Sequence, residues 1–217
     1  GVLAAEFIAR SQPDGYTAMS VSSGTIIIRP YLTKNLSYDP FKDFTPITPL
    51  YRSTTVLVAH PQAAGSIAEL IDYAKRNPGK ITYGSAGIGT PDHLNGETIK
   101  QITGIDIVHV PYKASSLALN DLVAGRISMS FAILAAVSAH VKSGKLKALA
   151  VIGKRSSAVP NVPALDEFIP GFEPVPSWNG IFGPGGIPKP VLNRLYEAVA
   201  SALKQPKSME RWERYGY

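Results

Sequence analysis

The stretch that decides the fold reads Tyr83-Gly-Ser-Ala-Gly-Ile-Gly-Thr-Pro-Asp-His-Leu-Asn-Gly-Glu97. The β-branched and aromatic residues at 81–83 predict a strand, and the small residues that follow predict a tight loop. Thr90 followed by Pro91 is typical of a helix N-terminus, because proline suits the first helical position. We expect this helix to run to Gly104. A strand, a short loop and a helix in this order indicate an α/β protein.

The same order of elements repeats along the chain. Upstream, Ser66 with Glu69 three residues later forms a capping-box pattern, which predicts a helix that ends near Arg76. Strands that alternate with helices of about ten residues favour βαβ units, and hence a mostly parallel sheet. Downstream, the apolar patterns predict strands over 107–110, 127–131 and 147–152 and helices over 115–124 and 134–143.

The beginning of the chain has the apolar spacing of an amphipathic helix, with Leu3, Phe7 and Ile8 on one face. No strand, N-cap or charged leader comes before that helix, so we expect the chain to be part of a longer protein. Near the other end, residues 156–176 hold five prolines and predict a connecting segment, which is followed by a strand over 178–182. A further amphipathic helix is expected over 191–203.

The composition excludes several classes of function. The chain has 217 residues, no cysteine, and a net charge of +6 from 22 basic and 16 acidic residues. Without cysteine there is no disulfide framework, thiolate metal site or cysteine nucleophile. No stretch approaches the roughly 20 apolar residues of a membrane span. The basic residues are scattered singly along the sequence, so we expect no binding to nucleic acid.

The loop at 84–90 offers a place for an anion but no catalytic group. Free backbone N–H groups at a helix N-terminus, together with the helix dipole, bind phosphate or carboxylate. The loop lacks the lysine of a Walker A motif, the third glycine of a dinucleotide fingerprint and the Gly-x-Ser-x-Gly spelling of a nucleophile elbow. The alternative is a tight connection that binds nothing. The histidines lack metal-ligand spacing and the carboxylates are dispersed, so we expect no metal site and no catalytic pair.

Three other places are candidates for contact with a ligand. His93 lies in the first turn of the predicted helix, where it either faces a ligand or hydrogen-bonds the helix end. Residues 22–25 form a second hydroxyl-rich loop, Ser-Ser-Gly-Thr, after a strand expected over 16–21. Trp178 either belongs to the core or lines a cleft.

Six segments stand together in a characteristic order and spacing. They are Pro13-Asp-Gly-Tyr-Thr17, Tyr38-Asp-Pro-Phe-Lys-Asp-Phe44, Tyr83-Gly-Ser-Ala-Gly87, Gly89-Thr-Pro-Asp-His-Leu-Asn-Gly-Glu97, Ile107-Val-His-Val-Pro-Tyr-Lys113 and Ser177-Trp178. With these segments the chain resembles, over nearly its whole length, the Bug/TctC family of periplasmic solute receptors of tripartite tricarboxylate transporters.

The resemblance implies an α/β fold of two Rossmann-like domains with a ligand cleft between them, the type II periplasmic binding protein. It places residues 1–50 and 178–217 in the first domain and residues 51–177 in the second. It also implies that the first strand and the Gly-rich ligand loop of the family come before Gly1, so that the N-terminal part of the first domain is missing from this chain.

The resemblance further implies where a small carboxylate binds. Asp92 departs from the family pattern, because it puts a negative charge close to the expected anion. Ala132 is expected in the strand-to-helix turn after Phe131, where many relatives carry an acid. Its loss favours a plain carboxylate, including a di- or tricarboxylate or an aromatic one, over an amino acid. The implied ligand-binding residues are Ser22, Ser23, Gly24, Thr25, Ser85, Ala86, Gly87, Gly89, Thr90, His93, Ala132 and Trp178.

In function, the resemblance implies a monomeric periplasmic receptor, secreted across the inner membrane, that uses no cofactor and catalyses no reaction. Its partners would be a small carboxylate and the membrane subunits of the transporter. Two alternatives stay open on the sequence. The same fold could act as a ligand sensor for a membrane kinase, or an enzyme could use residues 87–90 for a phosphorylated substrate, with only His93 at hand as a base.

Overall fold

The structure is a computed structural model that describes residues 2–175 and 177–214. These residues form two compact units. The first unit takes the chain up to Arg52 and resumes at Ser177, and the second takes residues 53–175. Each unit has its own sheet and its own hydrophobic core.

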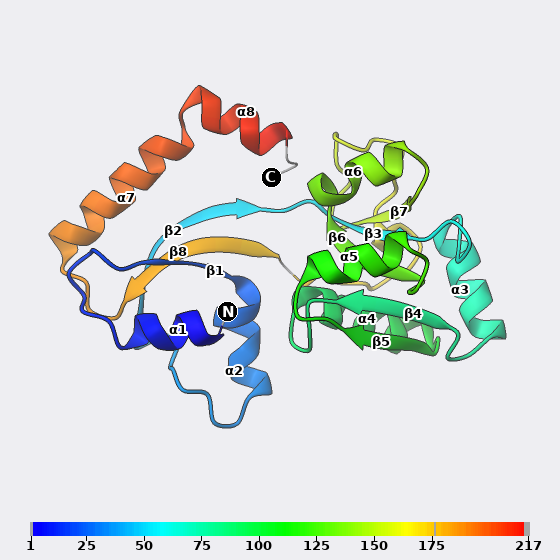
Figure 1. Ribbon diagram of the computed structural model, residues 1–217, viewed down its shortest axis with the longest axis horizontal. Coiled ribbons are helices and arrows are strands. Elements are labelled where there is room, and N and C mark those ends of the chain that lie inside the picture. Colours follow the sequence, from blue (N-terminus) through cyan, green and yellow to red (C-terminus); the bar gives the residue numbers. More distant parts are fainter. Residues whose placement is uncertain (1, 176, 215–217) are drawn as a thin grey trace. The chain divides into compact units, whose positions relative to one another are not determined.

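The sheet of the first unit has the strand order β1-β8-β2 (Figure 1). Strand β8 (Trp178–Pro184) lies in the middle and pairs in antiparallel fashion with β1 (Met19–Ser22) and with β2 (Phe44–Arg52). The helices of this unit are α1 (Val2–Ala9), the π-helix η1 (Gly24–Ile28), α2 (Arg29–Leu32), α7 (Lys189–Leu203) and α8 (Pro206–Arg214).

The predicted N-terminal helix forms, but it buries a different face from the one expected. Ile8 is buried, whereas the side chains of Leu3 and Phe7 are 82% and 67% exposed. Ala5 and Ile8, three positions apart and therefore on one side of the helix, pack into the core of the first unit. Because Leu3 and Phe7 are four positions apart, they share a second side that the unit leaves uncovered.

The sheet of the second unit has five strands in the order β5-β4-β6-β3-β7. The strands are β3 (Thr55–Ala59), β4 (Ile81–Ser85), β5 (Ile107–Pro111), β6 (Met129–Ile133) and β7 (Lys147–Ile152). The helices are α3 (Ile67–Arg76), α4 (Pro91–Thr103), α5 (Ser115–Val123), α6 (Leu134–Lys142) and the 3₁₀ turn η2 (Leu165–Glu167). The alternation predicted from the sequence is confirmed.

The expectation of a mostly parallel sheet holds for four of the five strands and fails for β3. Strand β4 is parallel to β5 and β6, but β3 is antiparallel to both of its neighbours, β6 and β7. The four strands joined by helices, β4 to β7, do share one direction, as right-handed βαβ crossovers require. Strand β3 is also joined to β4 by a helix, α3, but it runs opposite to β4, so this connection is not a parallel βαβ crossover and the crossover rule does not apply to it. The strand inserts between β6 and β7 in the opposite direction.

Helices cover both faces of this sheet. On one face, α3 and α4 pack over Leu57, Tyr83 and Phe131, and on the other, α5 and α6 pack over Val56 and Val58. Figure 1 shows α5 in front of the sheet and α4 behind it. Helix α4, whose N-terminus follows the small-residue loop, is therefore anchored along the buried side of β4, and the loop is held between two rigid elements.

The N-cap predicted for α3 is present. The Ser66 hydroxyl accepts a hydrogen bond from the Glu69 N–H at 3.2 Å, and the Glu69 carboxylate accepts one from the Gly65 N–H at 2.7 Å. The return bond thus reaches one residue further out than in the standard capping box, but it still satisfies a backbone donor ahead of the helix.

Removal of this cap gives a first testable prediction. We expect Ser66→Ala to lower the free energy of unfolding by about 1 kcal/mol, because the Glu69 N–H then loses its partner. Urea denaturation measures the change. Ser115→Ala is the matched control, since Ser115 is the first residue of α5 and caps nothing with its side chain. Equal losses in the two variants would contradict a capping role for Ser66.

Candidate ligand site

The loop between β4 and α4 has the backbone shape that its glycines allow. Gly87 has φ +113° and Gly89 has φ +81°, both in the left-handed region that favours glycine. Pro91 is the first residue of α4 and Gly104 ends the helix, as the sequence predicted. The loop therefore connects the end of the buried strand β4 directly to the N-terminus of α4.

The two hydroxyl groups of the loop hold the loop itself. The Ser85 Oγ accepts a hydrogen bond from the Gly87 N–H at 3.0 Å and lies 3.2 Å from the Gly87 carbonyl, to which it can donate. The Thr90 Oγ1 donates to the same carbonyl at 2.8 Å and accepts from the His93 N–H at 3.4 Å as the helix cap. Because Ser85 is only 1% exposed, its hydroxyl is committed to the loop rather than directed outward.

The remaining backbone donors of the loop define where an anion can bind. The N–H groups of Gly87, Gly89 and Thr90 are hydrogen-bonded within the loop or its helix. Among the residues that the structure describes, the N–H groups of Ala86 and Asp92 have no such partner. They lie at the start of the loop and in the first turn of α4, where the helix dipole favours negative charge.

Asp92 is the group with the most unusual protonation in this region. Its side chain is half-buried, and no ion pair with it is found among residues 2–175 and 177–214. Burial raises the pKa of Asp92 to about 7. Near neutral pH this carboxyl group is thus divided between a neutral form, which leaves the helix N-terminus free for an anion, and a charged form, which competes with one.

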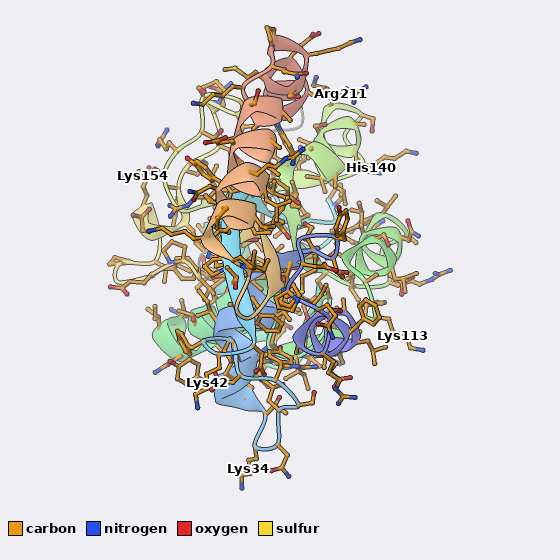
Figure 2. All side chains as sticks on the ribbon, turned by 90° about the vertical axis from the view of Figure 1, so that its left-hand side faces the viewer. Lys34, Lys42, Lys113, His140, Lys154 and Arg211 are labelled. Carbon is orange, nitrogen blue, oxygen red and sulfur yellow. The ribbon has the colours of Figure 1, made fainter. Side chains whose placement is uncertain are left out.

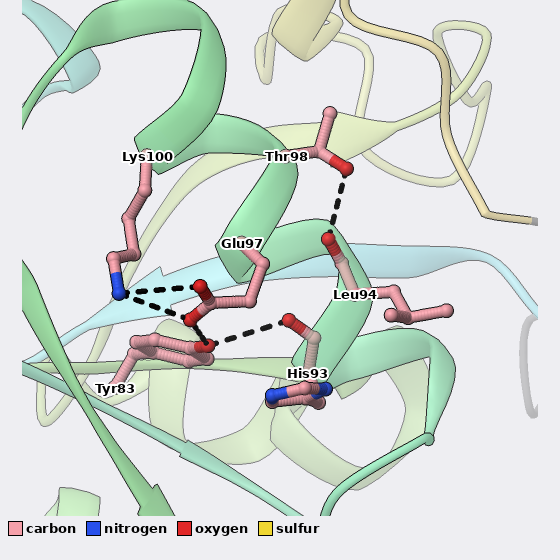
Figure 3. A network of polar contacts seen from close by, with 6 residues as sticks. All are labelled: Tyr83, His93, Leu94, Glu97, Thr98 and Lys100. Carbon is pink, nitrogen blue, oxygen red and sulfur yellow. Dashed lines mark hydrogen bonds and ion pairs between the residues drawn. The ribbon is translucent and has the colours of Figure 1, made fainter. Parts of the chain in front are cut away.

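A polar network supports the first turns of α4 from below (Figure 3). The Tyr83 hydroxyl donates to the Glu97 carboxylate at 2.7 Å, and the Lys100 ammonium lies 3.2 Å from the same carboxylate. Burial, and then the bond to Glu97, raises the pKa of Tyr83, which therefore stays a donor. Burial alone would raise the pKa of Glu97, but its bonds to Tyr83 and Lys100 outweigh that effect and lower it. The network keeps Glu97 charged and α4 in place.

The structure adds one residue that the sequence reasoning did not select. In the parallel pair of β4 and β5, His109 lies opposite Tyr83, and its ring stacks on the Tyr83 ring with centroids 4.9 Å apart. Its Nε2 is 2.6 Å from the Ser85 Oγ, and its ring centroid is 4.4 Å from that of His93. The alternation of side chains in β5 could have placed His109 on one face of the sheet. It could not have identified Tyr83 as the residue opposite, because that depends on the register between the two strands.

His93 does hydrogen-bond the helix end. Its Nδ1 accepts from the Gly89 N–H at 3.4 Å, and its own N–H is capped by Thr90. Burial lowers the pKa of both His93 and His109, so both rings are neutral near pH 7.

The cation that follows β5, Lys113, is exposed and its side chain points away from the ribbon (Figure 2).

Ala132 does not lie in a strand-to-helix turn. It is inside β6, where it pairs with Val56 of β3, and α6 begins directly after the strand. The strand starts and ends two residues later than the apolar pattern indicated. The reason is that Ile127 belongs to the preceding turn, where its side chain is buried under the sheet rather than paired in it.

The candidate residues of the first unit are placed by its own elements. Ser22 ends β1, and the helical backbone begins at Ser23, so residues 23–25 are not a loop but the start of η1. The carbonyl of Thr25 accepts a hydrogen bond from the Tyr38 hydroxyl at 2.7 Å. Ser23 is buried, whereas Ser22 and Thr25 are half-buried.

Trp178 lines a groove of the first unit. The groove has a volume of about 460 Å³ and runs along β2 and β8, with Tyr51, Trp178 and Phe182 among its walls. The rings of Trp178 and Phe182 are stacked with centroids 6.3 Å apart. Trp178 is half-buried, so it belongs to the wall of the groove rather than to the core.

The part of the chain that the structure describes has neither a cluster of metal ligands nor a membrane-spanning helix. No group of three or more histidine, cysteine or acidic side chains is arranged to hold a metal ion there. None of its helices has the length and apolar character needed to cross a membrane.

Comparison with known proteins identifies the family. The family model described as "Tripartite tricarboxylate transporter family receptor" (TctC) matches residues 1–216. The chain belongs to this family. Members of the TctC family are solute-binding receptors with the two-domain periplasmic binding protein fold, and not enzymes. The resemblance inferred from the six segments is thereby confirmed.

Three solved structures resemble the chain over nearly all of its length. Rpa4515 of Rhodopseudomonas palustris with adipate is 30% identical, with a TM-score of 0.93 over 100% of this chain and 73% of that one. The periplasmic binding protein BugD is 33% identical, with a TM-score of 0.90 over 99% and 72%. MatC of Rhodopseudomonas palustris with bound malate is 30% identical, with a TM-score of 0.89 over 99% and 74%. The chain spans slightly less than two thirds of the length of the first three curated relatives it matches, 63–65%.

Proposed function

We propose that the protein is an extracytoplasmic receptor that captures a small dicarboxylate or related carboxylate and delivers it to the membrane subunits of a tripartite tricarboxylate transporter. The observation that carries this proposal is the segment 85–92, which, among the described residues, has an unpaired backbone donor at the start of the loop, Ala86, and another in the first turn of α4, Asp92. An anion placed there would be held by dipoles, since no lysine or arginine occurs between Lys80 and Lys100.

The relatives support a carboxylate as the ligand class. Rpa4515 and MatC, which carry adipate and malate in their structures, are similar to this chain over 100% and 99% of its length. A neutral site made of N–H groups suits a carboxylate better than a phosphate dianion, because no positive side chain balances the second charge. As the family resemblance implies, we also propose Ser22, Ser23, Gly24, Thr25 and Trp178 of the first unit as ligand contacts. Ala132 carries no charge that would attract an amino group, which favours a plain carboxylate over an amino acid.

The test is a binding screen of the full-length gene product. We expect isothermal titration calorimetry to find binding by at least one member of a panel of acetate, malate, adipate, citrate and benzoate, and none by ATP. A bound carboxylate at a hundred times Kd should also stabilise the protein by about 2.7 kcal/mol in thermal unfolding. Binding of ATP with measurable hydrolysis, or no binding across the panel, would overturn the proposal.

Asp92 sets a pH dependence for this binding. At pH 8 most Asp92 side chains are charged, so Asp92→Asn is expected to tighten carboxylate binding by about tenfold, since two like charges several ångströms apart no longer repel. Below pH 6 the parent side chain is neutral and the two proteins should bind alike. Affinity of the parent should therefore fall as the pH rises through about 7, while the Asn variant lacks this component.

Calorimetry at pH 5.5 and pH 8 with both proteins measures this effect. Protonation of His93 and His109 at low pH affects parent and variant equally, so the difference between them isolates Asp92. A difference that is the same at both pH values would show that Asp92 does not titrate near the bound anion.

A further inference from the structure

His109 and Ser85 form a contact that the binding of an anion does not by itself require. The His109 Nε2 lies 2.6 Å from the Ser85 Oγ, and Ser85 is 1% exposed, so this bond is sealed beneath the loop. The ring of His109 is held in turn by its stacking on Tyr83, which is fully buried. The imidazole therefore has a fixed orientation, and its partner is the residue at which the chain leaves β4.

Ser85 connects His109 to the backbone of the loop. Its Oγ is placed to make two bonds with Gly87, accepting from the N–H at 3.0 Å and donating to the carbonyl at 3.2 Å. A serine hydroxyl has one hydrogen and two acceptor positions. All three contacts of Ser85 can exist together only if the His109 Nε2 carries a hydrogen and donates it, because the single serine hydrogen is then free for Gly87. Hydrogen counting thus assigns the Nε2–H tautomer.

Gly87 is the point in the loop where orientation matters most. Its φ of +113° turns the chain, and its carbonyl also accepts the hydrogen bond of Thr90. If Ser85 rotated away, the Gly87 peptide would lose two partners, and the N–H group of the adjacent Ala86 would lose its direction.

We propose that His109 is a positioning residue for carboxylate binding: through its bond to Ser85 it fixes the Gly87 peptide and so directs the N–H groups of the loop toward the anion. This role rests on the proposed function. In this role His109 makes no contact with the anion and acts only through Ser85.

The test compares substitutions that keep or remove the donor. His109→Gln can place a side-chain N–H where Nε2 stood, whereas His109→Leu has similar bulk and no donor. With the tightest-binding member of the acetate, malate, adipate, citrate and benzoate panel as probe, we expect His109→Leu to raise Kd by about tenfold and His109→Gln to raise it by less than about threefold. Calorimetry at pH 8 avoids changes of imidazole charge, because burial lowers the pKa of His109 and His93 from 6.5. His140→Leu on α6 is the control for loss of an imidazole elsewhere in the second unit.

A double-mutant cycle separates positioning from a general structural effect. Ser85→Ala should raise Kd about as much as His109→Leu, and the double variant should be no weaker than either single one, since both remove the same connection. Equal loss in the Gln and Leu variants, or additive losses in the cycle, would overturn the proposal. If His109→Leu fails to fold, His109→Gln compared with Ser85→Ala still decides it, because only Ser85→Ala should then weaken binding. Binding by the parent with unchanged Kd in every variant would refute the positioning role alone, whereas no binding by the parent would refute the proposed function.

Discussion

Replacement of Gly89 by valine is expected to weaken carboxylate binding by more than about a hundredfold while the protein stays folded. Gly89 has φ +81°, a conformation that a β-branched residue adopts only with strain. The valine variant would relieve that strain by changing the path between Gly87 and Thr90. The N–H groups of Ala86 and Asp92, on either side of this path, would then change position relative to each other, and each charge-assisted hydrogen bond lost is worth roughly 1.5–3 kcal/mol.

The matched control for this prediction is Gly104→Val. Gly104 also has a positive φ, +70°, and ends the same helix, but a Cβ there would meet no other atom within 4 Å. Both substitutions thus introduce backbone strain, and only one lies in the loop. Calorimetry with malate and adipate and urea denaturation should show similar losses of stability and very different losses of affinity. Parent-like affinity in a folded Gly89→Val protein would place the anion elsewhere.

Much of the fold follows from local sequence signals, but the direction of β3 does not. The cap at Ser66, the helix start at Pro91 and the stop at Gly104 depend on residues within one turn, and all three are found as predicted. The position of β3 depends instead on pairing with β6 and β7, which lie 70 or more residues away in the sequence. Local periodicity marks β3 as a buried strand, but it carries no information about the direction of its partners.

In the candidate site, too, features set by the local sequence were predicted, and features set by contacts between side chains were not. The loop at 85–90 could be predicted as a candidate ligand-binding loop from the sequence alone, because its glycines and the helix start that follows them are local features. The roles of Ser85 and Thr90 were less accessible, because a hydroxyl near a helix N-terminus can serve a ligand or the backbone, and only the distances to Gly87 distinguish them. His109 was missed as a functional residue because its partner belongs to a neighbouring strand.

Gly96 provides the second large effect, this time on stability. In most helices Gly→Ala is stabilising by up to about 1 kcal/mol, because alanine has the higher helix propensity. Gly96 lies in the middle of α4, and a Cβ at this position would be 2.3 Å from the Cε2 of Tyr83. The Tyr83 ring has no room to yield, since it is fully buried, stacks on His109 and is hydrogen-bonded to Glu97.

We therefore expect Gly96→Ala to lower the free energy of unfolding by about 1–3 kcal/mol, the cost typical of overpacking a core, and so to reverse the sign that helix propensity gives. Urea denaturation measures the change. Gln101→Ala, on the exposed side of the same helix, controls for alanine propensity and should stay within about 0.5 kcal/mol of the parent. A stabilised Gly96→Ala protein would mean that α4 stands further from β4 than described. The loop between them would then lack the rigid frame on which the anion site depends.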